Sequence, residues 1–415
     1  MTIQSTPYSP ATPKSTLKQQ LSQLDAVFIG LAAMLGAGVF VVFGPAALLA
    51  GSWLQFAIVL AAIVAYLNAS TIAQLAAVVS RPGGTYAYGR HYLSNNWGFL
   101  AGAAFLVGKM GSAAAISLVF ASYLTPGFEI VTASLAIVVM AVINILGVNR
   151  TAFGSKILAG ITIAFLLVLV VAALFAPATN VPLESPTGIG VLTAASLLFF
   201  AFAGYARVAT LGDEVKDSRV AVPRAIIISL GIVFVIYLSL AWLVENRLGA
   251  LVVGSVTPLA DLAAVSFGNA SFVFVFAAVA SLGSLLALLA GMSRTAATMA
   301  EDGELPKALA TRSGNGTPWL AEAFIALLAI VLAASGSFAL TIGLSSFAIL
   351  VYYAIANLAG YRQPAVEAKR SKVWNIFGLL LCLALAFSVP LEGLVLGLVV
   401  LLVAMILRWG LSKLG

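Results

Sequence analysis

The first long apolar segment of the sequence, residues 25–50, carries Gly36-Ala37-Gly38 at its centre. Glycine weakens a helix. A helix that breaks at membrane depth frees N–H and C=O groups, which only buried protein or a water-filled cavity can satisfy. The two half-helix ends can then bind a zwitterion, with N–H groups holding its carboxylate and carbonyls holding its ammonium. The alternative is that these glycines only permit close helix packing.

A second weak point, Ala203-Gly204, lies near the middle of the apolar segment 188–212. The two interrupted segments each begin a block of five apolar segments. Because five is an odd number, the second block starts on the opposite side of the membrane from the first. The second block is therefore inverted relative to the first. Breaks at corresponding positions of inverted halves are the best sequence indication of a transporter's binding site. Helix packing is again the alternative for Gly204.

Lys109 is a charged residue near the middle of the apolar segment 97–123. A lysine at the bilayer centre costs at least about 2.5–3.5 kcal/mol, so we expect its side chain to face the interior of a helical bundle. There it is a candidate for proton coupling or for binding an anionic group of a substrate. The alternative is a structural lysine bonded to helix carbonyls at a kink. Lys156, nearer the end of its segment, is expected to be a snorkelling or gate charge.

The composition places these segments in a membrane. Of 415 residues, 62% are hydrophobic and 8% are charged, which is typical of a polytopic membrane protein and excludes an ordinary soluble domain. A span needs about 20 residues to cross a bilayer. We predict twelve spans, at roughly 25–50, 53–79, 97–123, 128–147, 154–176, 188–212, 223–245, 270–298, 319–335, 337–360, 373–389 and 391–410.

The distribution of basic residues predicts the orientation. All 21 lysines and arginines fall on one side of this arrangement, except Arg247 on the opposite side and Lys109 within a span. Cytoplasmic loops of membrane proteins carry an excess of lysine and arginine. We therefore expect a multi-pass protein of the plasma (inner) membrane with both termini in the cytoplasm. The net charge of +7 therefore reports topology, and no nucleic-acid partner is expected.

The spans divide the chain into parts. The predicted parts are a disordered cytoplasmic tail (1–22), a first inverted repeat (23–176), an extracellular loop (177–187), a second inverted repeat (188–360), and the last two spans with a short cytoplasmic C-terminus (361–415). The first apolar stretch is too long for a signal peptide and should remain in the mature protein. The last two spans lie outside the repeat and are expected to be peripheral.

The residue inventory argues against enzymatic chemistry. Cys382 is the single cysteine, so neither an intramolecular disulfide nor a cysteine-based metal site is expected. His91 is the single histidine and falls in a short loop beside Arg90, where a solvated side chain is expected. No nucleophile with a partner base is evident. We therefore expect no catalytic residues, no metal and no cofactor.

Four short motifs occur in order along the chain. They are Gly-Ala-Gly-Val-Phe at 36–40, Pro-Gly-Gly-Thr-Tyr at 82–86, Phe-Ala-Phe-Ala-Gly-Tyr at 200–205 followed by Asp-Glu-Val-Lys at 213–216, and Met-Ala-Glu-Asp-Gly-Glu-Leu-Pro at 299–306. At this spacing they resemble the amino acid–polyamine–organocation (APC) superfamily of secondary transporters, over spans one to ten. The resemblance implies an all-α, five-plus-five inverted-repeat fold. It also implies discontinuous helices 1 and 6, and alternating access around a midplane site.

The resemblance also implies a substrate site. The residues carried over are Met34, Gly36, Ala37, Gly38, Phe200, Ala203 and Gly204. The N–H groups of residues 36–38 should hold the substrate carboxylate, and the carbonyls of Met34, Phe200 and Ala203 should hold its ammonium. Phe200 matches an aromatic gate that closes over bound substrate.

Two departures from the pattern concern coupling. Several proton-coupled relatives carry a lysine in helix five, whereas the alignment places Thr162 there, with Lys156 about a turn and a half nearer the cytoplasm. Some relatives carry an acid just after the helix-six break, whereas this chain has Ala206-Arg207. Ser281 and Ser284 lie where sodium-coupled relatives bind their ion, although helical serines more often bond their own backbone. The coupling candidates are therefore Lys109, Thr162 and Lys156, and sodium stays open.

The leading hypothesis is a plasma-membrane amino acid permease coupled to protons. An amino acid/amine exchanger is the alternative from the same class, and a channel-like or sensory amino-acid-binding membrane protein is the alternative from another. Every acidic residue, Glu322 included, falls at a span end or in a loop, and Lys109 would repel a second cation. We therefore predict a neutral α-amino acid as substrate. The particular amino acid, the direction of transport and the oligomeric state are not determined by the sequence.

Overall fold

The chain folds into a bundle of helices, seen here in a computed structural model that describes residues 21–79, 83–147, 152–179, 181–186, 188–209, 215–368 and 370–414. The regular structure of these residues is helical, apart from one isolated β-bridge between Leu21 and Val215. The helices that coincide with predicted spans are α1 (Gln23–Met34), α2 (Ala37–Val41), α3 (Phe43–Ala50), α4 (Leu54–Ala76), α6 (Asn95–Leu124), α7 (Glu129–Ile145), α8 (Ala152–Phe175), α9 (Gly190–Phe202), α10 (Ala206–Ala209), α11 (Ser218–Leu243), α13 (Ser271–Glu301), α14 (Trp319–Ala333), α15 (Phe338–Arg362), α16 (Lys372–Ala386) and α17 (Leu391–Leu414).

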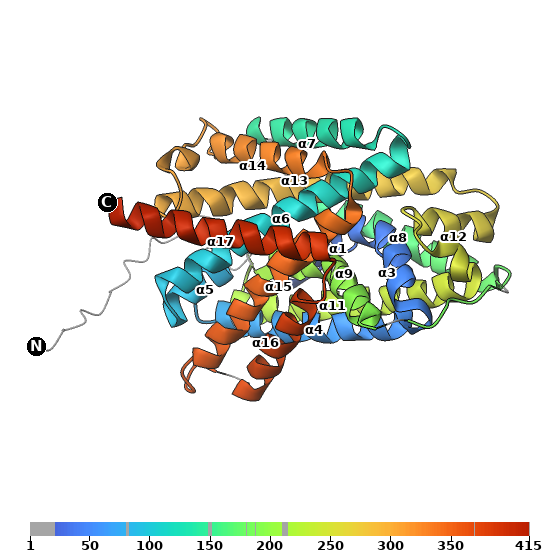
Figure 1. Cartoon of the computed structure of the whole chain (residues 1–415), viewed down its shortest axis with the longest axis horizontal. Coiled ribbons are helices and arrows are strands. Elements are labelled where there is room, and N and C mark those ends of the chain that lie inside the picture. Colours follow the sequence, from blue (N-terminus) through green and yellow to red (C-terminus); the bar gives the residue numbers. More distant parts are fainter. Residues whose placement is uncertain are drawn as a thin grey trace, which may run out of the picture.

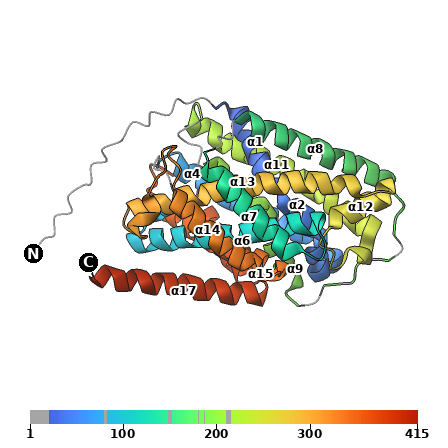
Figure 2. The same ribbon diagram turned by 90° about the horizontal axis from the view of Figure 1, so that it is seen from above.

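The helices confirm a membrane protein with several spans. Eight helical stretches of the described chain are long and apolar enough to cross a membrane, and five further apolar helices are shorter. One of the shorter ones, α12 (Pro258–Phe267), was not predicted, nor was the loop helix α5 (Thr85–Tyr92). The figures show α6, α13 and α17 running along the long axis of the molecule (Figures 1 and 2).

Both predicted interruptions are present. Helix α1 ends at Met34 and α2 begins at Ala37, so the break falls on Leu35 and Gly36. Helix α9 ends at Phe202 and passes through a 3-10 turn, η2 (Ala203–Tyr205), into the short α10. The prediction of discontinuous first and sixth helices is therefore correct for the described residues. Asp213 and Glu214 of the third motif, and Pro82 of the second, lie outside those residues.

Helix α6 is held against α15 by glycine contacts, and this positions its functional face. A Cβ atom at Gly108 would lie 2.7 Å from the Ile349 side chain, and one at Gly111 would lie 2.9 Å from the Thr341 carbonyl oxygen. Consecutive side chains of an α-helix point in different directions around its axis. With Gly108 and Gly111 against α15, the side chain of Lys109 is turned toward the centre of the bundle.

Two of the motif loops meet at the end of α13. The Tyr86 hydroxyl donates to Asp302 Oδ2 at 2.6 Å, and Arg90 Nη1 donates to Glu304 Oε1 at 2.8 Å. Arg408 of α17 binds the other oxygen of the same carboxylate at 2.6 Å. Burial and the hydrogen bond to Asp302 raise the pKa of Tyr86 above its ordinary value, which already lies well above neutral pH, so its hydroxyl is a donor there. Helix α17 is thus tied to the core of the bundle by a shared carboxylate.

Removing this carboxylate should strongly destabilise the contacts among α5, the end of α13 and α17. The Glu304 side chain is only 9% exposed and forms ion pairs with two arginines, and breaking a buried charge pair costs about 3–5 kcal/mol. Glu304→Ala should therefore lower the melting temperature of the purified protein. The matched control is Glu301→Ala, because the Glu301–Arg312 pair is about half exposed and such pairs contribute roughly 0–1 kcal/mol. Equal melting temperatures for both variants would contradict the assignment.

Helix α16 is not merely peripheral. The Thr71 hydroxyl of α4 lies 2.9 Å from Asn357 Oδ1 of α15 and 3.0 Å from Asn375 Oδ1 of α16. The Asn357 amide donates to Asn68 Oδ1 at 2.7 Å, and the Cys382 thiol lies 3.1 Å from the same oxygen. All of these side chains are buried. Because buried polar groups are costly unless they are bonded, this network fixes α16 against α4 and α15.

Candidate functional site

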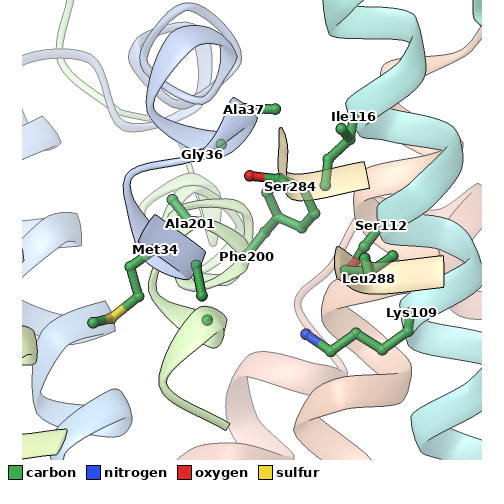
Figure 3. A pocket seen from close by; sticks show the side chains of 13 residues that line it. Met34, Gly36, Ala37, Lys109, Ser112, Ile116, Phe200, Ala201, Ser284 and Leu288 are labelled. Carbon is green, nitrogen blue, oxygen red and sulfur yellow. The ribbon is translucent and has the colours of Figure 1, made fainter. Parts of the chain in front are cut away.

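A small cavity of about 40 Å³ lies between the two helix breaks, with room for a few water molecules. Its lining residues come from α1, α2, α6, α9, α13 and the η2 turn: Ala33, Met34, Gly36, Ala37, Gly38, Lys109, Ser112, Ile116, Phe200, Ala201, Gly204, Ser284 and Leu288. Figure 3 shows the side chains of α6 and α13 facing the broken helices. The cavity therefore brings together segments that are far apart in the sequence.

Most of the predicted site residues line this cavity. Six of the seven residues carried over from the resemblance are among them, together with Lys109. Ala203 is buried in the η2 turn and does not line the cavity. Thr162 is buried on α8 and is also absent from the lining. The side chain of Lys156 lies outside the described residues.

The two breaks pack directly against one another. A Cβ atom at Gly204 would lie 2.4 Å from the carbonyl oxygen of Ala33 and 2.7 Å from the backbone nitrogen of Met34. A Cβ atom at Gly38 would lie 3.0 Å from Ala201 Cα. The glycine of each break thus lies against the backbone of the other broken helix. Close packing and an open backbone are therefore not alternatives here, since the same glycines serve both.

Two tyrosines satisfy carbonyl oxygens of the broken first helix. The Tyr237 hydroxyl of α11 donates to the Met34 carbonyl at 2.6 Å and lies 3.3 Å from the Ala201 carbonyl. The Tyr123 hydroxyl of α6 donates to the Phe40 carbonyl at 2.8 Å. A carbonyl oxygen has two lone pairs, so the Met34 carbonyl can accept a second donor. The first N–H groups of α2 have no partner within that helix.

Lys109 lies in the cavity with its ammonium group aimed at the broken helices (Figure 3). None of the described residues forms a hydrogen bond or an ion pair with it. Ser112, one turn further along α6, bonds the hydroxyl of Ser345 at 2.7 Å and so stays fixed on the α15 side. The Met34 side chain points away from the cavity, so Met34 contributes its backbone. Lys109 is therefore the cationic side chain of the described cavity lining.

Aromatic side chains outside the cavity lining pack together around α2. The Phe40 ring stacks on Phe165 with centroids 6.1 Å apart, and Phe165 stacks on Phe276 at 4.4 Å. The Tyr123 ring meets Phe40 edge-on, and Phe40 is fully buried. On the other side, toward the start of α1, the lining residues Ala33, Lys109, Gly204 and Leu288 are partly exposed. These lining residues are therefore more exposed than the residues of α2, all of which are buried.

Sequence reasoning missed several lining residues. Ile116 and Leu288 carry no sequence signal that separates them from lipid-facing apolar residues, and Ala201 lies within the third motif but was not singled out. Ser284 was singled out as a possible sodium ligand, and it packs against Gly36, where a Cβ atom would lie 2.1 Å from Ser284 Oγ. Ser281 is fully buried, and its hydroxyl has no partner among the described residues. Glu322 is fully buried too, accepts a hydrogen bond from Asn144 at 2.7 Å and lies outside the cavity lining.

Comparison with known proteins places the chain in a family. A model described as "Amino acid permease" matches residues 21–409 of the chain. The chain belongs to the amino acid permease family. An uncharacterized transporter of Mycobacterium tuberculosis is 40% identical to this permease over 404 residues, which is 95% of this chain and 92% of the relative.

More distant relatives differ in what their names state. The branched-chain amino acid permease BcaP of Bacillus subtilis is 25% identical, over 77% of this permease and 75% of its own chain. The serine/threonine exchanger SteT of the same organism is 27% identical, over 91% of both chains. The resemblance to the APC superfamily is thereby confirmed. The named substrates and modes of transport belong to those proteins and do not select one for this permease.

Proposed function

We propose that this permease imports a neutral α-amino acid across the plasma membrane by alternating access, in symport with protons. The observation that carries the proposal is the cavity between the two interlocked breaks. The N-terminal N–H groups of α2 suit a carboxylate, and the carbonyls at the end of α1 suit an ammonium group. Family membership supports a transporter and not an enzyme.

The charges around the cavity support a neutral substrate. The described lining holds one cation, Lys109, and no carboxylate. A cationic side chain or a polyamine would meet repulsion without compensation in a site of low dielectric constant. The small lining residues Ala33, Ala37, Ala201 and Gly204 suit a small or medium side chain. Phe200, whose ring lies at the cavity between Ala201 and Ser284, is proposed as the gate.

The proposed topology has twelve spans with both termini in the cytoplasm, and the five-plus-five inverted repeat relates 23–176 to 188–360. In that orientation the buried aromatic cluster around Phe40 lies on the outer side of the cavity, which supports a conformation closed to the outside. Protons are the proposed coupling ion because Lys109 lies in the cavity without a partner among the described residues. The proposed lipid environment is the inner membrane.

The decisive experiment is an uptake panel in proteoliposomes, with and without an inward proton gradient. We expect accumulation of neutral amino acids that requires the gradient, with arginine, lysine, putrescine and cadaverine transported at least tenfold more slowly. A polyamine or basic amino acid competing better than neutral ones would overturn the substrate assignment.

An exchanger is the second candidate, since one relative is named as an exchanger. Amino acid preloaded inside the vesicles distinguishes the two functions. A symporter accumulates substrate into empty vesicles when a gradient is imposed, whereas an obligate exchanger requires internal substrate and ignores the gradient. Rapid conduction without saturation or trans-stimulation would instead indicate a channel.

A further inference from the structure

A groove of about 350 Å³ shares no lining residue with the central cavity, and two of its lining side chains, Leu174 and Trp242, are exposed on the surface of the bundle. Its walls come from the start of α4 and the ends of α8 and α11: Gln55, Val170, Leu174, Leu238, Ser239, Trp242 and Leu243. Several large apolar side chains that neighbour its lining residues in the sequence are exposed, among them Phe56, Val171 and Phe175. An exposed apolar surface of a membrane protein is covered by lipid, so the groove opens toward hydrocarbon.

The mouth of this groove carries two opposite charges on one turn. The end of α11 winds into a π-helical turn, η3 (Val244–Leu248), which holds both Glu245 and Arg247. Arg247 Nη2 donates to the carbonyl of the groove residue Leu174 at 2.8 Å, and its guanidinium lies 5.9 Å from the ring centroid of Trp242. Glu245 accepts from the groove residue Gln55 at 2.9 Å. Both charges are therefore anchored to the groove walls.

The arginine retains unused binding capacity. A guanidinium has five N–H donors and matches a phosphate well, and no described carboxylate forms an ion pair with Arg247. Arg247 is also the basic residue that stands apart from the others in the predicted topology. Exposed tryptophans and phenylalanines lie at the same end of α4 and α11, where Trp53, Phe56 and Trp242 form a belt typical of the lipid headgroup level.

We propose that the groove binds one phospholipid with an amine headgroup. An acyl chain lies along the apolar wall of α8 and α11, the phosphate binds Arg247, and the headgroup ammonium binds Glu245. The opposite charges at the mouth complement a zwitterion and offer no net attraction to an anionic lipid. A quaternary headgroup cannot donate hydrogen bonds to Glu245. The site is separate from the substrate cavity and does not depend on the transport function.

The test measures lipid retention by native mass spectrometry of the purified full chain. Phosphatidylethanolamine, phosphatidylcholine and phosphatidylglycerol with identical acyl chains are titrated onto delipidated protein. We expect phosphatidylethanolamine to be retained about tenfold more tightly than either of the others, since charge-assisted hydrogen bonds contribute that much. Equal retention of the three lipids, or tightest retention of phosphatidylglycerol, would overturn the proposal.

Conservative variants assign the two charges. Arg247→Gln should weaken retention of all three lipids, while glutamine still offers a donor to the Leu174 carbonyl. Glu245→Gln should remove only the preference for phosphatidylethanolamine, while keeping an acceptor for Gln55. The matched control is Arg219→Gln, an exposed arginine at the other end of α11, which should change nothing. Unchanged lipid retention in Arg247→Gln would sink the proposal.

Discussion

Replacing Gly204 with valine should abolish amino acid uptake, because the new side chain has no space between the two broken helices. Even its Cβ atom would lie 2.4 Å from the Ala33 carbonyl oxygen and 2.5 Å from the Ala33 carbonyl carbon. Contacts this short are with backbone, which cannot rotate away, and overpacking of this kind costs at least about 1–3 kcal/mol. The two breaks would separate, and substrate affinity should fall by more than tenfold. Uptake and a substrate-induced thermal shift measure both effects.

Alanine at other glycines provides matched controls. Gly231 of α11 and Gly291 of α13 have nothing within 4 Å of the position of an added Cβ, and glycine to alanine in a helix is mildly stabilising. Gly231→Ala and Gly291→Ala should therefore leave uptake intact. Gly38→Val should insert into the membrane yet lose binding, since its Cβ would lie 3.1 Å from that of Ala201. Normal uptake by Gly38→Val and Gly204→Val would place the substrate site elsewhere.

Lys109→Ala should abolish accumulation driven by a proton gradient while leaving exchange of substrate across the membrane measurable. The reason is that Lys109 lies in the cavity lining, with no hydrogen-bond or ion-pair partner among the described residues, so the alanine variant removes a proton carrier without breaking a bonded network. Lys109→Arg should also fail to couple, since arginine keeps its charge and does not deprotonate in proteins. Gradient-driven uptake and counterflow, measured on the same vesicles, separate coupling from binding.

A structural lysine would behave differently in this experiment. Lys109→Arg would then keep both gradient-driven uptake and counterflow. Lys109→Ala would lower the stability of the protein and slow both activities equally. A useful control is Ser112→Ala, because Ser112 also lines the cavity but carries no charge. In that variant, uptake should depend on the proton gradient as it does in the unmodified protein, and net transport should run in the same direction. Full gradient-driven accumulation in both Lys109 variants would exclude Lys109 from coupling.

The sequence alone determined the membrane class, the approximate ranges of the long apolar helices and both breaks. Long apolar runs must form helices in a bilayer, since only helices satisfy their own backbone there. Glycine at residue 36 and at residue 204 marked the places where the helices stop. Lys109 was predicted to face the interior because a mid-membrane charge cannot face lipid. These conclusions depend on the chemistry of residues that are close together in the sequence, so the sequence is enough to reach them.

Only the tertiary structure decided which groups meet. Nothing in the sequence indicates that Gly204 lies on the backbone of Ala33, or that the Tyr237 hydroxyl reaches the Met34 carbonyl. Thr162, aligned with a coupling lysine, lies outside the cavity lining, and α16 is bound into the core by Asn375. Such contacts join helices that are more than a hundred residues apart. They depend on how whole helices pack in three dimensions, and periodicity within one segment holds no information about its neighbours.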